Sequence, residues 1–187
     1  MSRAGFVLVG GRSTRMGRDK ARLPFRNGML VEHIAREVEK AAGSVWLVGA
    51  PERHRDLLWP AIPDLFPGAG PVAGIHAALA SGRADWNLVV ACDMPEIAAP
   101  LLRELLDAAV QAGKPALAPL SPGDQIQALC AVYHRDCLPV FEQALREGRR
   151  RLRDVIAELD MALWPVAEPR WFRNLNTPDE WVAFAGR

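Results

Sequence analysis

The sequence predicts a single α/β domain over residues 1–187, with an open, mostly parallel sheet and helices on both of its faces. Apolar runs of strand length alternate with segments of helical periodicity over the first two-thirds of the chain. Within the run 86–92, the residues Leu88 to Ala91 show no polar alternation, which is typical of a strand buried on both faces. A chain of 187 residues can enclose one sizeable core, and no repeat, low-complexity tract or linker divides it.

Each element has its own signal. An apolar run predicts the first strand at 5–9. The segment 31–42 is predicted to be a helix because its apolar residues share one face, and Gly43 is a typical helix terminator. A capping box that begins at Thr177, with Pro178 as first helical residue, predicts a last helix. The other expected elements are strands at 44–48, 86–92, 116–119 and 128–133, an extended piece at 62–64, and helices at 72–80, 101–112 and around 140–145.

Composition favours an ordinary soluble protein. Half of the residues are hydrophobic, 24% are charged and the formal net charge is +1, so nothing points to nucleic acid or a membrane surface as partner. The three cysteines have neither metal-ligand spacing nor an even number for a disulfide framework, which favours the cytoplasm. We expect neither a signal peptide nor a membrane span, because no apolar run approaches the roughly 20 residues that a span needs.

The first predicted strand leads into a loop suited to a polyanion. Gly10 and Gly11 allow a sharp turn and a close approach of the backbone to a ligand. Four cations follow, against Asp19 as a single acid: Arg12, Arg15, Arg18 and Lys20. The spacing fits neither the Walker pattern nor the dinucleotide-binding fingerprint. We therefore predict a phosphate-binding loop of another type.

Asp93 follows the predicted central strand. Ligands of open α/β sheets bind outside the carboxyl ends of the strands, so Asp93 and the loop after the first strand should meet at one edge. A carboxylate at this place can instead cap the next helix, but the following Met94-Pro95 favours an extended backbone. A nucleotide phosphate is the obvious polyanion for the loop after the first strand. A nucleoside triphosphate bound there needs Mg²⁺, which takes one or two protein carboxylates as ligands. We predict that Asp93 holds Mg²⁺.

The string 8–20, Leu-Val-Gly-Gly-Arg-Ser-Thr-Arg-Met-Gly-Arg-Asp-Lys, resembles the signature of the molybdenum cofactor guanylyltransferases, a family of molybdopterin nucleotidyltransferases. Three further segments are similar to motifs of this family: Cys-Asp-Met-Pro at 92–95, Asp64 with the Gly-Pro-Val-Ala-Gly turn at 70–74, and Asn-Leu-Asn-Thr-Pro-Asp-Glu at 174–180. The resemblance extends over essentially the whole chain. It implies a Rossmann-like nucleotidyltransferase fold.

The resemblance also implies roles for individual residues. The implied catalytic residues are Arg15, Lys20 and Asp93, the last as the metal ligand. The implied nucleotide-binding residues are Leu8, Val9, Gly10, Gly11, Lys20, Asp64 and Asp93. On the molybdopterin side the candidates are Asn176 and, from the basic cluster 149–153, Arg150 and Arg151. We expect Gly70 and Gly74 to let the backbone approach the ribose or base, and Arg22 to be an ordinary solvated charge.

The implied reaction is the transfer of GMP from GTP to the phosphate of molybdenum-bound molybdopterin, with release of pyrophosphate. Mg²⁺ is the expected cofactor, and molybdoenzyme apoproteins or delivery chaperones are the further partners that this product suggests. One alternative is a cytidylyltransferase, whose members typically show Ala-Ala-Gly where this chain has Val9-Gly10-Gly11. Others are a sugar-phosphate nucleotidyltransferase, which usually has a longer chain, and a non-catalytic nucleotide-binding or cofactor-delivery adaptor. The presence of both Lys20 and Asp93 argues against the adaptor.

Overall fold

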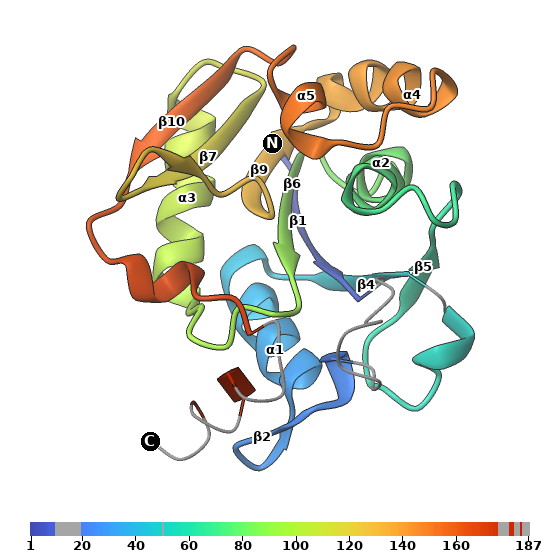
Figure 1. The fold of residues 1–187 in the computed structure, drawn as a ribbon, viewed down its shortest axis with the longest axis vertical. Coiled ribbons are helices and arrows are strands. Elements are labelled where there is room, and N and C mark those ends of the chain that lie inside the picture. Colours follow the sequence, from blue (N-terminus) through green and yellow to red (C-terminus); the bar gives the residue numbers. More distant parts are fainter. Residues whose placement is uncertain (10–19, 50, 176–179, 182–183, 185–187) are drawn as a thin grey trace.

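A computed structural model describes residues 1–9, 20–49, 51–175, 180–181 and 184 (Figure 1). Within them, an eight-stranded sheet has the strand order β10-β7-β9-β6-β1-β4-β5, and β8 pairs with β7 outside this path. The strands of this sheet are β1 (Arg3–Leu8), β4 (Val45–Gly49), β5 (Ala61–Pro63), β6 (Trp86–Ala91), β7 (Ala116–Ser121), β8 (Gln125–Ile126), β9 (Cys130–His134) and β10 (Met161–Pro165). A small hairpin of β2 (Pro24–Phe25) and β3 (Gly28–Met29) stands apart from the sheet.

Helices cover both faces of the sheet, as the sequence predicts. One face packs against α1 (Leu30–Ala42) and α3 (Ala99–Gln111). The other face packs against α2 (Pro71–Ala80), α4 (Leu138–Arg146) and α5 (Leu152–Ile156). Four short 3-10 helices complete the described elements: η1 (Lys20–Arg22), η2 (Pro51–Arg53), η3 (Arg135–Cys137) and η4 (Pro169–Phe172). The α/β fold class with a mostly parallel sheet is confirmed.

The centre of the sheet is buried on both faces and is apolar apart from Asn87. All six residues of β6 are buried, which confirms the expectation for the segment 86–92. Strand β1 lies between β6 and β4 and is parallel to both. Gly5 in β1 is pressed against α1, because a Cβ at this position would lie 2.2 Å from Cγ1 of Val38 and 3.0 Å from the carbonyl oxygen of Ser44. The sheet and α1 therefore approach more closely here than a side chain would permit.

Several strands differ from the sequence-based expectation. Strand β9 runs antiparallel to both of its neighbours, β6 and β7, so the sheet is mixed rather than parallel throughout. Strand β10, which has no sequence prediction, pairs with β7 at the edge. The β2–β3 hairpin is also absent from the prediction. The start of the last predicted helix, at Thr177 and Pro178, lies outside the described residues.

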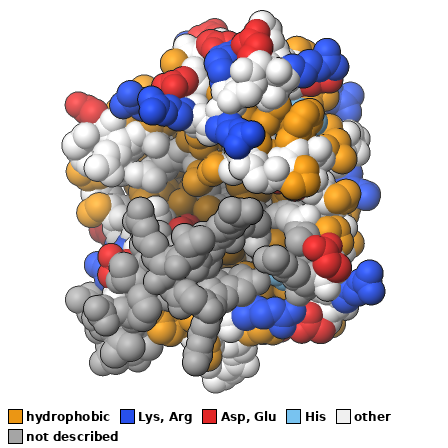
Figure 2. All heavy atoms as spheres, turned by 45° about the vertical axis from the view of Figure 1, so that its right-hand side comes forward, with side chains coloured by type: hydrophobic (Ala, Val, Ile, Leu, Met, Phe, Trp, Pro, Cys, Tyr) orange, Lys and Arg blue, Asp and Glu red, His pale blue; other side chains and the backbone are white. Residues whose placement is uncertain are grey.

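The surface carries charges of both signs. Figure 2 shows Lys and Arg side chains interspersed with Asp and Glu side chains over the face that it draws, in agreement with a formal net charge of +1. The three cysteines are free thiols. Among the described residues, none of the helices has the length and apolar character needed to cross a membrane.

Candidate functional site

The carboxyl ends of β1 and β6 form the centre of the candidate site. Leu8 is in register with Ala91, and the next amide along, that of Cys92, donates a hydrogen bond of 3.3 Å to the Leu8 carbonyl. On the other side of β1, the Val9 amide donates to the Val48 carbonyl at 2.9 Å. The chain therefore leaves β1 and β6 at the same edge, while the expected approach of the loop after β1 to Asp93 stays a prediction, because residues 10–19 lie outside the described part of the chain.

Asp93 is half-buried in the loop between β6 and α3. Its backbone carbonyl accepts a 3.1 Å hydrogen bond from the amide of Leu175, so the segment that begins at Asn174 is anchored beside it. The alternative reading of Asp93 as the cap of the next helix is wrong. The first amide of α3, that of Ala99, donates instead to the carboxylate of Glu37 at 2.9 Å.

Asp64 lies just after β5, on the α2 side of the same edge. Its amide donates to the Gly49 carbonyl at 3.2 Å, and its Oδ1 accepts from the amide of Phe66 at 2.8 Å. These two hydrogen bonds fix the backbone of the turn that leads to α2. Gly70, at the start of that helix, has φ of 71°, a left-handed conformation that favours glycine.

Gly74 and Leu8 contact each other in the core. Both are buried, and a Cβ on Gly74 would lie 3.0 Å from Cδ2 of Leu8. The absence of a side chain at Gly74 thus serves the packing of α2 on β1. The expected approach of the Gly74 backbone to a ribose or base stays a prediction beside this packing role. The Leu8 side chain is likewise enclosed, so only its backbone is available to a ligand at this edge.

Several predicted site residues fall outside the described part of the chain. They are Gly10, Gly11, Arg15 and Asn176. Lys20 begins η1, and its side chain is also outside that part. The structure therefore brings together the ends of β1 and β6, Asp93 and the segment at Leu175, while the roles implied for the glycine loop stay predictions.

Arg22, expected to be a solvated charge, forms a two-pronged ion pair. Its Nη1 and Nη2 donate to Oδ2 and Oδ1 of Asp56 at 2.9 and 2.6 Å. These hydrogen bonds lower the pKa of the Asp56 carboxyl to about 2. The pair joins the end of η1 to the loop that follows η2. Its partners are 34 residues apart, so the sequence alone does not indicate the pair.

Arg150 and Arg151 lie in the connection between α4 and α5, and both are exposed. Figure 1 shows these helices near the N-terminal end of β1, away from the end that carries Val9. The structure does not bring the two arginines to the edge that carries Asp93. The charge of their neighbour Arg149 is balanced by ion pairs with Glu147 and Glu158.

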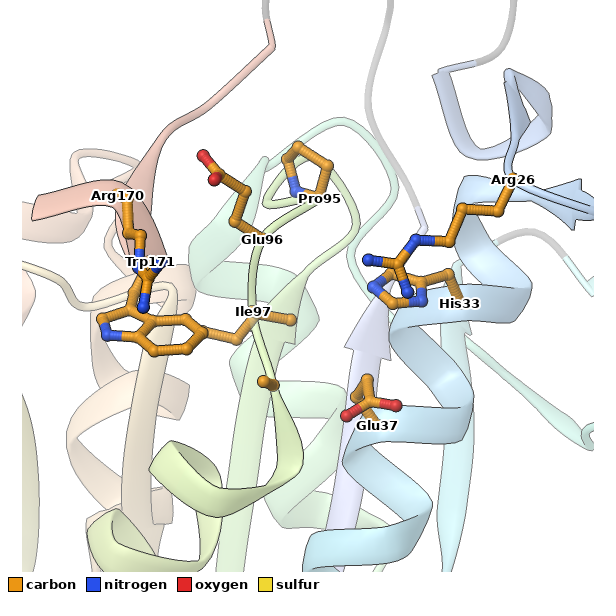
Figure 3. Close-up of a pocket in the computed structure, with 9 residues that line it drawn as sticks. Arg26, His33, Glu37, Pro95, Glu96, Ile97, Arg170 and Trp171 are labelled. Atoms are coloured by element: carbon orange, nitrogen blue, oxygen red, sulfur yellow. The ribbon is translucent and has the colours of Figure 1, made fainter. Parts of the chain in front are cut away.

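A pocket of about 290 Å³ opens beside the Asp93 loop, on the α1 side of the sheet (Figure 3). Its lining comes from the β2–β3 hairpin, α1, the loop after β6, and η4. The charged and aromatic residues among its walls are Arg26, His33, Glu37, Glu96, Arg170 and Trp171. The sequence analysis did not single out any of these six. Two of them, His33 and Glu37, are one helical turn apart on α1. This spacing is the feature of the sequence that could have indicated the pocket.

The donor set at the edge fits Mg²⁺. Among the described residues no group of three or more His, Cys, Asp or Glu side chains could hold a metal ion. Mg²⁺ bound with a nucleotide needs only one or two protein carboxylates, since phosphates and water supply its other ligands. Asp93, a half-buried carboxylate at the carboxyl ends of two parallel strands, meets that requirement.

An open α/β sheet with a Gly-Gly sequence after its first strand and an aspartate after its central strand has the architecture of a nucleotidyltransferase. The chain belongs to the family of the MobA-like NTP transferase domain, whose model matches residues 5–162.

Similar proteins carry related names. A protein of Opitutus terrae, named "Probable molybdenum cofactor guanylyltransferase", is 37% identical over 188 residues, which cover 95% of this chain and 92% of the relative. A protein of Pelotomaculum thermopropionicum with the same name is 33% identical, covering 95% and 89%. The crystal structure of molybdopterin-guanine dinucleotide biosynthesis protein A from Archaeoglobus fulgidus superimposes with a TM-score of 0.81, 29% identity and coverage of 96% and 95%.

Proposed function

We propose that this protein transfers GMP from GTP to the phosphate of molybdenum-bound molybdopterin, which yields the molybdopterin guanine dinucleotide cofactor and pyrophosphate. The proposal rests on family membership, since relatives of 33% and 37% identity are named for this activity. Its single structural support is the meeting of the β1 end, Asp93 and Leu175 at one edge of the sheet. Consistent with three free thiols, we place the reaction in the cytoplasm.

The proposed transfer of GMP needs little proton transfer by the side chains of the protein. The attacking oxygen belongs to a phosphate monoester, which is largely dianionic at neutral pH because its second pKa is near 6. It needs no general base. The barrier is electrostatic, because one anion must approach the α-phosphorus of another.

The proposed roles of the residues follow from this barrier. Asp93 would hold Mg²⁺, which supplies positive charge at the phosphates when bound. Lys20 and Arg15 would bind the phosphates and hold them for an in-line displacement, with pyrophosphate leaving. Gly10, Gly11, and the backbone of Leu8 and Val9 would line the nucleotide, with Asp64 on the α2 side.

On the acceptor side, Asn176 is proposed to contact molybdopterin, because the segment before it is anchored to the Asp93 carbonyl through Leu175. Arg150 and Arg151 are proposed to bind an anion. Their distance from the Asp93 edge favours the acidic surface of a protein that receives the product over the phosphate of molybdopterin. A molybdoenzyme apoprotein or a delivery chaperone would present such a surface.

A pyrophosphate-release assay tests the proposal. The protein is incubated with Mg²⁺, molybdopterin and each of the four nucleoside triphosphates in turn. Release with GTP that depends on molybdopterin is the expected result. Preferential release with CTP would make the protein a cytidylyltransferase, and release with none of the four would leave a nucleotide-binding adaptor.

A further inference from the structure

The pocket beside the Asp93 loop has a defined position relative to the proposed reaction. Asp64 and α2 flank the carboxyl edge on one face of the sheet, whereas the pocket lies on the other face, against α1. The loop after β6 separates the two, and its residues Pro95 to Ala98 form one wall of the pocket. A ligand in the pocket would therefore lie across the loop from the nucleotide side, with Asp93 only two residues before the wall.

Glu37 supplies a permanent negative charge to this pocket. Figure 3 shows its carboxylate directed toward the loop from α1, below His33. Its two oxygens accept from Nζ of Lys40 at 2.7 Å and from the amide of Ala99 at 2.9 Å. Burial would raise the pKa of Glu37, but these two hydrogen bonds outweigh it and the net shift is downward. A carboxylate has about four acceptor positions, so two remain for a ligand.

His33 supplies a neutral acceptor next to that charge. Burial, together with the nearby charge of Arg26, lowers its pKa, so the ring is neutral at pH 7. The backbone of Pro95 acts in the opposite direction on this pKa but does not reverse the shift. A neutral imidazole keeps one ring nitrogen as an acceptor. The α1 wall thus offers acceptors and suits a ligand rich in N–H groups.

The mouth of the pocket has the opposite character. Arg26 and Arg170 approach from opposite sides in Figure 3, and both are exposed. Arg26 is held in the β2–β3 turn with φ of 51°, and Arg170 lies over the indole of Trp171 at 4.7 Å. Arg170 is also paired with Glu168 at 2.9 Å, so Arg26 is the guanidinium at the opening that suits an anionic substituent of a ligand whose ring lies deeper.

We propose that this pocket binds the pterin ring of the acceptor, with the N–H groups of its 2-amino-4-oxopyrimidine edge donating to Glu37. This inference rests on the proposed function. Guanine presents the same edge, but its nucleotide is assigned to the other side of the Asp93 loop, so the pocket is the acceptor's. Arg26 at the mouth then faces the side of the pterin that carries its anionic groups. No residue of this pocket belongs to the site implied by the sequence.

Fluorescence anisotropy of two simple pterins tests the inference on the intact protein. The probes are 6-hydroxymethylpterin, which is neutral, and 6-carboxypterin, which is anionic. Glu37→Gln should weaken binding of both at least ~10-fold, because an amide N–H replaces one acceptor of a charge-assisted pair. Lys40→Gln is the matched control, since it removes the same Lys40–Glu37 ion pair but keeps the carboxylate, and it should bind both pterins as the unchanged protein does.

A second variant keeps the test independent of the α3 cap that Glu37 provides. Arg26→Ala should weaken binding of 6-carboxypterin several-fold and leave 6-hydroxymethylpterin unaffected. Equal pterin affinity in the unchanged protein and Glu37→Gln would overturn the inference, as would a matching loss in Lys40→Gln. Displacement of the pterins by GTP alone would assign the pocket to guanine and overturn it too.

The outcomes also separate this inference from the proposed function. Pterin binding that depends on Glu37, with no pyrophosphate release from any triphosphate, would support the pocket and reject the transferase. Release of pyrophosphate from GTP, with an unchanged KM for molybdopterin in Glu37→Gln, would support the transferase and reject the pocket.

Discussion

The backbone and side chain of Asp93 make separate contributions. The carbonyl anchors Leu175, and this hydrogen bond does not depend on the side chain. Met94, which follows, is buried and holds the loop in the core. A change of the carboxylate can thus be expected to spare the fold.

We predict that Asp93→Ala lowers turnover by about 10²-fold or more, as removal of a principal electrostatic group does. Pyrophosphate release at saturating Mg²⁺ and GTP measures the effect, and thermal unfolding provides the control. Turnover near that of the unchanged protein, at matched stability, would remove Asp93 from the proposed metal site.

Lys20 and Arg22 are cations two residues apart with different expected roles. We predict that Lys20→Ala reduces turnover more than Lys20→Arg, because the proposed role is placement of a charge on phosphate. Arg22 is instead paired with Asp56, and Arg22→Ala should act mainly by releasing the Asp56 pKa from about 2 toward its ordinary value of 3.8. Steady-state kinetics and NMR titration of Asp56 measure the two effects. Equal losses of turnover in Lys20→Ala and Arg22→Ala would contradict the distinction.

At the scale of elements, the contact between β1 and α1 sets a limit on sequence change. We predict that Gly5→Ala destabilises the fold by about 1–3 kcal/mol, because its Cβ would overlap Cγ1 of Val38. Val38→Ala removes that atom but leaves a cavity, so this variant is also destabilised. In chemical denaturation the double variant should lose less than the sum of the two single losses. Strict additivity would show that the backbone of Ser44, and not Val38, is the obstacle.

The α4–α5 connection gives another prediction. Arg150→Ala and Arg151→Ala should leave GTP affinity unchanged, because this connection lies away from the edge that carries Asp93. Titration with GTP and Mg²⁺ measures this, and the apparent KM for molybdopterin then identifies the anion. A raised KM would assign the arginines to the acceptor phosphate; an unchanged KM leaves the acidic surface of a partner. A loss of GTP binding would contradict both.

The elements also show what the sequence could and could not predict. Apolar periodicity located α1 within one or two residues, since it buries a continuous face. Helix α2, which is buried on nearly all sides, was located by its small residues. The direction of β9 was not predictable, because a fully buried apolar strand carries no sign of its orientation. Strand β10 was missed because it is a partly exposed edge strand that ends in Pro165.

The same limit applies to the site. Asp93 was found because it follows an unmistakable buried strand. Glu37 was not, because its partner Ala99 is about sixty residues away and a polar residue on a helix otherwise indicates solvent. The same holds for His33, whose position beside the loop after β6 does not show in the sequence.

At the scale of the whole molecule, nucleotide preference should appear as stability. A ligand that binds the folded state alone stabilises it by about 2.7 kcal/mol at a hundred times its Kd. With Mg²⁺ present, we therefore predict that GTP raises the unfolding temperature more than CTP or ATP at equal concentration. Differential scanning fluorimetry measures the three shifts, with Asp93→Ala as the control for metal-dependent binding. An equal shift with CTP would favour the cytidylyltransferase.

The position of β1 in the sheet has a consequence during synthesis on the ribosome. This strand emerges before both of its partners, and β4 can pair with one of its edges as soon as it follows. The other edge waits for β6, whose Trp86 is the partner of Arg3. Until then the nascent chain exposes an apolar strand edge that can pair with a neighbouring chain. Slower translation between β4 and β6 would prolong that interval, so the yield of folded protein should depend on the speed of elongation through this stretch.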